Sequence, residues 1–180
     1  MVDTKFNNKM SEILRSMKDK TFKSYEYESL DKWGNPYGCV RFNLGRYAVD
    51  LTNFVQEIDF FGKIEDIPVF KCEKKELSDP FCMNTDTVAN MVDEVIKEVS
   101  IVTDLITVED YDYSIAMDRA VIIKCEYNYY VFYKEWYYGE MVFIRSGKEM
   151  PSIYPIEKVA FDWGDYGEHK TTVKRTTRCL

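Results

Sequence analysis

The sequence predicts an α+β fold, mainly antiparallel β-sheet with an N-terminal amphipathic helix and one or two further helices. Long stretches alternate apolar and polar residues and are rich in Val, Ile, Tyr and Phe, which is typical of half-buried strands. Apolar residues at helical spacing are confined to a few short stretches. No internal repeat and no linker rich in Pro, Gly and Ser divides the 180 residues. We therefore expect a single α+β domain over residues 1–168 and a basic, flexible tail over residues 169–180.

The N-terminal helix is expected over residues 4–18. Its apolar residues recur at positions i, i+4, i+7, i+8 and i+11, which lie on one face of a helix. These residues are Phe6, Met10, Ile13, Leu14 and Met17. Asp3 is the expected N-cap, because a carboxylate can accept the unpaired amides of the first turn.

Five strands are expected to follow, at residues 22–30, 39–44, 46–52, 54–61 and 67–72. In the first of them, Tyr25 and Tyr27 alternate with two glutamates, as in a strand with two unlike faces. Residues 31–38 are dense in Asp, Gly, Asn and Pro, which predicts a chain reversal. Residues 71–80 are polar and predict a loop.

The second half of the chain begins with an expected helix over residues 85–97, where apolar residues again follow helical spacing. Its many β-branched residues weaken this pattern. Residues 99–108 favour a strand. An antiparallel block is expected next, with strands at residues 120–127, 129–133 and 137–145. A short helix is expected to begin at Pro155, because proline suits the first turn and four apolar residues after it share a face.

Charge is segregated along the chain. The last twelve residues carry four Lys or Arg and no acid, while the preceding 168 residues carry a net charge of −11. Phosphate contacts dominate nucleic-acid affinity, so an acidic body disfavours nucleic acid as its direct ligand. Three roles are open for the tail: a disordered extension, which we expect first, a strap that pairs with the acidic body, or a tether to nucleic acid or protein.

The sequence predicts no cofactor and no metal. Its five cysteines are irregularly spaced and form no CxxC pair, so neither a disulfide framework nor a zinc site is expected. A single histidine, His169, disfavours a catalytic triad. No phosphate-binding loop occurs. No secretory signal and no apolar run long enough for a membrane span are present, which leads us to expect a cytoplasmic protein with no membrane partner.

Two acidic segments contain aromatic residues. The segment from Glu98 to Asp118 has six acids and no Lys or Arg, and a second patch at residues 162–168 surrounds Trp163 and Tyr166. Aromatic anchors with charged rims are typical of protein interfaces. The candidate interaction residues are Asp104, Glu109, Asp110, Tyr111, Asp112, Tyr113, Asp118, Asp162, Trp163 and Asp165.

These features lead us to expect a non-enzymatic protein that docks on a basic surface of another protein. The partner would be the basic nucleic-acid-binding site of a nuclease or related enzyme, because carboxylates can occupy a channel built for phosphates. Inhibitors of CRISPR nucleases carried by phages and mobile elements work in this general way, and the analogy is one of class. The sequence does not predict an oligomeric state.

Two alternatives remain open. The first is a metal-dependent nuclease that uses Asp59, Glu73 and Lys75, since an acid followed by Glu-x-Lys is a layout found in such enzymes. The second is a structural or assembly protein that self-associates through the aromatic residues of its sheet, which are concentrated between residues 127 and 138.

Overall fold

The computed structural model describes residues 1–29, 36–60, 62–81, 87–135 and 139–180. Their fold is mainly antiparallel β-sheet with two short helices. The strands are β1 (Val2–Asp3), β2 (Thr21–Ser29), β3 (Pro36–Asn43), β4 (Ala48–Phe60), β5 (Lys63–Lys75), β6 (Thr87–Val108), β7 (Tyr113–Cys125), β8 (Tyr129–Tyr133), β9 (Phe143–Gly147) and β10 (Thr171–Cys179). The helices are α1 (Asn8–Arg15), α2 (Ile156–Trp163) and the short 3-10 turn η1 (Glu109–Tyr111).

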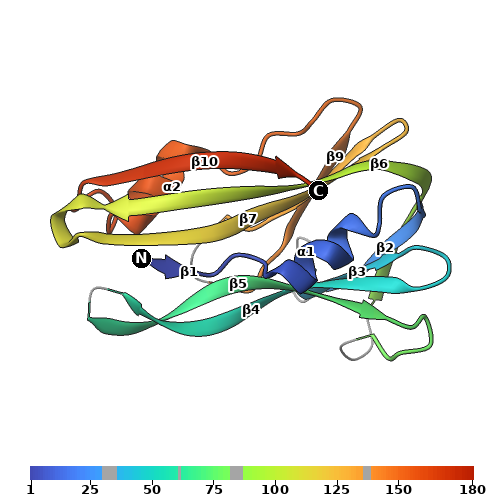
Figure 1. Cartoon of the computed structure of the whole chain (residues 1–180), viewed down its shortest axis with the longest axis horizontal. Coiled ribbons are helices and arrows are strands. Elements are labelled where there is room, and N and C mark those ends of the chain that lie inside the picture. Colours follow the sequence, from blue (N-terminus) through green and yellow to red (C-terminus); the bar gives the residue numbers. More distant parts are fainter. Residues whose placement is uncertain (30–35, 61, 82–86, 136–138) are drawn as a thin grey trace.

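The strands form two layers that share the long strand β6. The sheet order is β5-β4-β3-β2-β6-β7-β8-β9, with β10 added beside β6 and β1 beside β7. The first half of β6 pairs with β2, and its second half pairs with both β7 and β10. Figure 1 shows β10, β6 and β7 in one layer and β3, β4 and β5 in the other.

The space between the layers is filled by two apolar clusters. One is built around aromatic residues, with the ring centroids of Phe42 and Phe132 4.6 Å apart and Phe22 packed edge-on against Phe42. The other gathers around Trp163 and includes Ile106 from β6. These buried side chains explain why the strands hold two layers together rather than one open sheet.

The N-terminal helix is shorter than expected. It covers residues 8–15 rather than 4–18, and its N-cap is Asn7, whose side chain accepts the amide of Met10, rather than Asp3. The residues before it pair with β7 instead: β1 is parallel to it, and the Thr4 amide donates to the Ala116 carbonyl. Pairing with β7 therefore extends to Thr4, the first residue of the expected helix.

The helix expected over residues 85–97 is wrong, because residues 87–97 belong to β6; residues 85 and 86 lie outside the described residues. An extra residue in β6 shifts its register with β2, and Asp93 adopts the left-handed conformation there, with φ of 55°. Such a bulge moves the following side chains to the other face of the strand. Apolar residues on both sides of the bulge then imitate helical spacing, while their β-branched character fits the strand.

The C-terminal residues are also an ordered strand rather than a flexible tail. Strand β10 pairs with β6 along its whole length, from the register Thr171↔Val108 to Cys179↔Ser100. This pairing corresponds to the strap among the three roles considered for the tail. The short helix after Pro155 is confirmed, with Pro155 itself as N-cap. Most of the expected turn at residues 31–38 lies outside the described residues.

Candidate functional site

Four of the ten candidate interaction residues are buried and cannot belong to an exposed face. Asp104, Asp118, Asp162 and Trp163 each expose 6% of their surface or less. The prediction that these four residues form part of an exposed acidic surface is therefore wrong. In β6, Asp104 lies two residues from the buried Val102 and two from the buried Ile106. Residues two apart share one face of a strand, so the carboxylate of Asp104 points inward with these apolar side chains.

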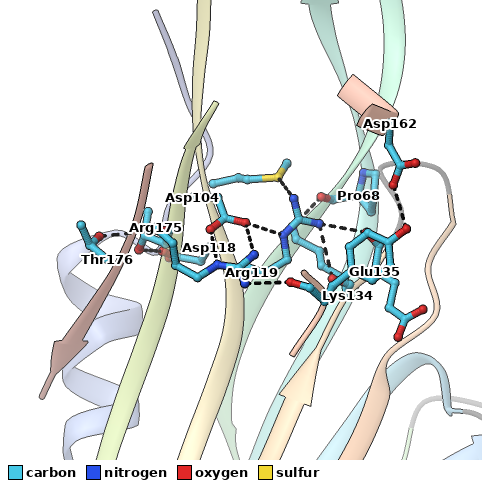
Figure 2. A network of polar contacts seen from close by, with 12 residues as sticks. Pro68, Asp104, Asp118, Arg119, Lys134, Glu135, Asp162, Arg175 and Thr176 are labelled. Carbon is cyan, nitrogen blue, oxygen red and sulfur yellow. Dashed lines mark hydrogen bonds and ion pairs between the residues drawn. The ribbon is translucent and has the colours of Figure 1, made fainter. Parts of the chain in front are cut away.

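Asp104 is the centre of a buried ion-pair network (Figure 2). Its carboxylate accepts hydrogen bonds from the guanidinium of Arg119 in β7 at 3.0 Å and from two nitrogens of Arg175 in β10 at 2.6 and 2.7 Å. A third nitrogen of Arg175 donates to the Tyr154 carbonyl. The tail arginine thus neutralises a buried acid, which gives this network a structural role.

Other buried polar groups extend this network. The Asp118 carboxylate accepts the Thr103 hydroxyl and the Phe6 amide, and burial raises its pKa. The Lys134 ammonium donates to the Pro68 carbonyl at 2.7 Å, and burial followed by the nearby Arg119 charge lowers its pKa well below the usual value. Neither group reaches solvent, so neither is placed to meet a partner.

The second acidic patch is likewise divided. Asp162 accepts the hydroxyl of Tyr154 at 2.9 Å, and Trp163 packs in the core cluster beside Val159. Asp165 and Glu168, which follow the helix, are exposed. The helix therefore buries its own acid and aromatic residue and leaves the residues of the next loop on the surface.

The exposed candidate residues come together at one end of the molecule. Glu109, Asp110 and Tyr111 form η1, the turn between β6 and β7, and Asp112 follows it. The Lys170 amide donates to the Asp110 carboxylate at 3.0 Å, which joins this turn to the loop between α2 and β10. Figure 1 shows the β6–β7 turn and the end of α2 at the same end of the chain's long axis.

We call this region the acidic tip, defined as residues 109–112, 161 and 165–169. Three aromatic side chains of the tip are about half exposed: Tyr111 at 50%, Phe161 at 51% and Tyr166 at 51%. The rings of Phe161 and Tyr166 meet edge to face with centroids 5.9 Å apart. The ring of Tyr111 meets His169 in the same way at 4.8 Å. The tip thus carries two aromatic pairs among its carboxylates.

Sequence reasoning missed two residues of the tip, Phe161 and His169. The position of Phe161 could have been found, because it falls off the apolar face that Ile156, Val159, Ala160 and Trp163 share in α2. The position of His169 could not, since its contact with Tyr111 depends on how β10 pairs with β6.

The charge of the tip remains negative. It carries five acids, namely Glu109, Asp110, Asp112, Asp165 and Glu168. Lys170 at its border pairs with Glu109, and His169 lies 3.7 Å from the Asp110 carboxylate. The Lys170–Glu109 pair is exposed, so it reduces the local charge without removing it.

Backbone strain is concentrated in the tip. Asp165, Tyr166 and Gly167 are consecutive residues with positive φ angles of 51°, 55° and 93°, and Asp112 has φ of 50°. Left-handed backbone costs a residue with a Cβ about 1–2 kcal/mol. Strain of this kind persists only where the surrounding structure enforces it, and it is common at functional sites.

Tyr113, the remaining candidate, is half-buried beside the tip. Its hydroxyl donates to the Asp59 carbonyl at 2.7 Å, which ties β7 to the end of β4. Burial raises the pKa of Tyr113 to about 12. Tyr113 therefore lies next to the acidic tip and links β7 to β4, and it does not form part of the tip's exposed surface.

The residues of the nuclease alternative do not assemble. Asp59 pairs with Ile64 near one end of the β4–β5 hairpin, whereas Glu73 pairs with Asp50 nine residues further along. At about 3.3 Å per residue, this separation is roughly 30 Å. Lys75 forms an exposed ion pair with Glu73 at 2.7 Å. Within the described ranges, no group of three His, Cys, Asp or Glu side chains could hold a metal ion.

The aromatic block considered for self-association is mostly interior. Tyr130, Phe132 and Tyr133 of β8 are buried, while Tyr127 in the preceding turn is 68% exposed. Residues 136–138 of this block lie outside the described residues. The described part of the block therefore builds the core rather than a broad aromatic surface.

Comparison of the chain with protein-family models, with curated proteins and with solved structures found no match. In the part of the chain that the structure describes, no helix is both long and apolar enough to cross a membrane. The arrangement of the chain's own residues therefore carries the functional argument.

Proposed function

We propose that this protein is a non-enzymatic binding protein that docks its acidic tip on a basic surface of another protein. The observation that carries the proposal is the meeting of η1 with the α2–β10 loop, which gathers three half-exposed aromatic rings and five acids at one end. Aromatic side chains anchor interfaces, and a charged rim guides the approach of an oppositely charged partner.

The chemistry of the tip suits a lysine- and arginine-rich groove. Its carboxylates can accept charge-assisted hydrogen bonds from guanidinium groups, as phosphates do. Its rings can pack beneath guanidinium planes or between side chains of the groove. A nucleic-acid-binding site of an enzyme offers both features, so the proposed partner is a nucleic-acid-processing enzyme whose basic site the tip would block.

The strained loop adds support. A loop that holds Asp165 and Tyr166 in left-handed backbone restricts the direction in which the Tyr166 side chain leaves the chain before binding. Preorganisation of this kind reduces the entropy lost when a loop is ordered at an interface. Asp112 is held in the same backbone region on the other side of the tip.

The test is capture from a lysate of the source cells with three immobilised forms of the protein. The forms are the unaltered chain, a tip variant carrying Asp112→Asn and Glu168→Gln, and a control variant carrying Glu57→Gln and Glu76→Gln. Each variant removes two exposed carboxylates, so both have the same net charge. We expect a basic nucleic-acid-processing enzyme on the unaltered and control forms, reduced severalfold on the tip variant and released by heparin.

Equal capture by the tip variant and the control variant would contradict docking through the tip. Capture that resists both heparin and raised salt would contradict a basic groove as the docking surface, because exposed charge pairs weaken with salt.

A further inference from the structure

We infer that a second site, a pocket on the β3–β4 side of the molecule, binds a small organic cation: an ammonium group on a short aliphatic chain. The pocket has a volume of about 190 Å³. Its walls include Glu28, Tyr37, Asn53, Phe54, Phe81 and Glu140. None of these residues belongs to the acidic tip, so the inference is independent of the proposed function.

The pocket exists because a separate segment pairs with the start of β3. Strand β4 pairs with β3 only as far as Cys39↔Thr52. Beyond that point, residues 139–142 take the place beside β3: the Gly38 amide donates to the Glu140 carbonyl at 2.9 Å, and the Val142 amide donates to the Pro36 carbonyl at 3.0 Å. Backbone hydrogen bonds thus hold β3, β4 and residues 139–142 together around the hollow, and Glu28 of β2 and Phe81 complete its lining.

Two carboxylates give the pocket a negative lining. Glu140 is held by the Tyr37 hydroxyl, and this hydrogen bond raises the pKa of Tyr37. The amide of Val55 also approaches the Glu140 carboxylate at 3.4 Å. Glu28 is half-buried and makes no hydrogen bond or ion pair within the described part of the chain. Among the described lining residues, none is Lys or Arg, so the lining favours a cation.

A buried acceptor in the wall also lacks a donor. Asn53 is 1% exposed, and its side-chain nitrogen donates to the carbonyls of Gly139 and Met141 at 3.4 and 3.1 Å. These bonds fix the orientation of the amide. Its oxygen has no hydrogen-bond partner among the described residues. The partial negative charge of this buried oxygen is not offset by a neighbouring donor among these residues, so it adds to the attraction of the pocket for a cation.

The aromatic walls already attract cations of the chain itself. The Lys71 ammonium lies 3.6 Å from the ring centroid of Phe54, and the Arg41 guanidinium lies 4.9 Å from that of Phe81. The charge of Arg41 is paired with Asp50, whereas Lys71 is an exposed cation beside the pocket wall. The rings therefore suit a cationic ligand, and Lys71 should weaken its binding through like-charge repulsion.

The size of the pocket limits the ligand. Pockets for drug-sized molecules measure about 300–1,000 Å³, so this one accepts only a few heavy atoms. Its wall combines three aromatic rings with the carboxylates of Glu28 and Glu140. An alkylammonium places its short apolar chain against the rings and its three donors toward the acceptors.

The experiment is a titration of the ¹⁵N-labelled protein with three four-carbon probes of similar size, monitored by amide chemical shifts. The probes are n-butylammonium, neutral 1-butanol and the anion butyrate. We expect saturable shifts at the amides of Gly38, Thr52 and Phe54 with n-butylammonium, with a dissociation constant on the order of 1–10 mM. Butanol should bind at least severalfold more weakly, and butyrate should not bind.

Two variants make the test directional. Glu28→Gln should weaken n-butylammonium binding about two- to fivefold, whereas Lys71→Met should strengthen it by a similar factor. Glu149→Gln, a change at an exposed acid outside the pocket lining, should leave it unaltered. The inference is overturned if n-butylammonium gives no saturable shift, if butanol binds as well, or if the two variants change affinity in the same direction.

Discussion

At the scale of single residues, the acidic tip depends on backbone conformations that most side chains avoid. Asp165 and Tyr166 both lie in the left-handed region, and the loop continues through Gly167. Aspartate tolerates this region better than most residues because its short polar side chain bonds locally. The sequence pattern of alternating acids and aromatics had indicated the patch, and the conformation explains how Tyr166 is kept half exposed.

Replacing Asp165 with glycine should therefore stabilise the fold. Glycine adopts the left-handed backbone without strain, although it loses more freedom on folding, so we expect Asp165→Gly to raise the free energy of unfolding by about 0.5–1 kcal/mol. Urea denaturation followed by circular dichroism measures the change. The matched control is Asp66→Gly in β5, which should destabilise, because glycine weakens a strand interior. A loss of stability in Asp165→Gly would show that the loop is not strained.

At the scale of elements, β10 closes the second half of β6 and supplies the cation that a buried acid requires. Arg175 lies on the inward face of this strand with Val173, and its guanidinium bonds Asp104 together with Arg119 (Figure 2). The neighbouring Lys174 points to solvent. A strand that has the composition of a solvated basic tail thus supplies an ion-pair partner to the interior.

The contrast between these two neighbours is testable. Arg175→Met should lower the free energy of unfolding by about 1.5–3 kcal/mol, because it removes charge-assisted hydrogen bonds to Asp104 while Arg119 still compensates the acid. Lys174→Met removes the same charge from the surface and should change stability by less than about 0.5 kcal/mol. Both are measured by denaturant titration. Equal effects of the two variants would mean that β10 does not pack as described.

An element could be predicted from the sequence where its local pattern was decisive, and could not where its structure depends on a distant strand. Strand β2 and helix α2 have local patterns strong enough to be recognised. The sequence over residues 85–97 has a helical pattern, and only pairing with β2 across a bulge makes residues 87–97 a strand. Strand β10 is polar on most of its surface, so its order depends on β6, more than sixty residues earlier. For both β6 and β10, the pairing that decides the structure is long-range, so the local sequence pattern could not predict it.

The same reasoning applies to the candidate site. Asp110, Tyr111 and Asp112 sit in a turn, where exposure is the ordinary outcome, and the prediction placed them on the surface. Asp104 lies in the strand that the sequence predicted over residues 99–108, two residues from Val102 and from Ile106, so applying the alternation of faces to that strand would have turned it inward. The high content of acids alone does not distinguish an exposed turn from a buried strand position.

At the scale of the whole molecule, the interior contains acids of high pKa that must stay protonated. Burial raises the pKa values of the thiols of Cys72 and Cys125 to about 12, from 9.0. Burial likewise raises the pKa values of Tyr133 and Tyr154 to about 12, from 10.0. These groups are distributed over both core clusters and both layers, so their titration affects the fold as a unit.

The fold should therefore lose stability as pH rises from about 9 to 12. Below pH 9 these groups are protonated in both states, and their contribution is fully present. Between their unfolded and folded pKa values, only the unfolded chain loses the proton, so alkali favours unfolding. Lys134 acts in the opposite direction, since its lowered pKa makes the folded state gain stability up to about pH 10.5, but it is a single group. Unfolding free energies measured at pH 8, 9, 10 and 11 should not fall between pH 8 and 9 and should fall from pH 9 to 11, more gently between pH 9 and 10 in the Cys72→Ala, Cys125→Ala double variant. A flat or rising profile above pH 10 would contradict the burial of these tyrosines.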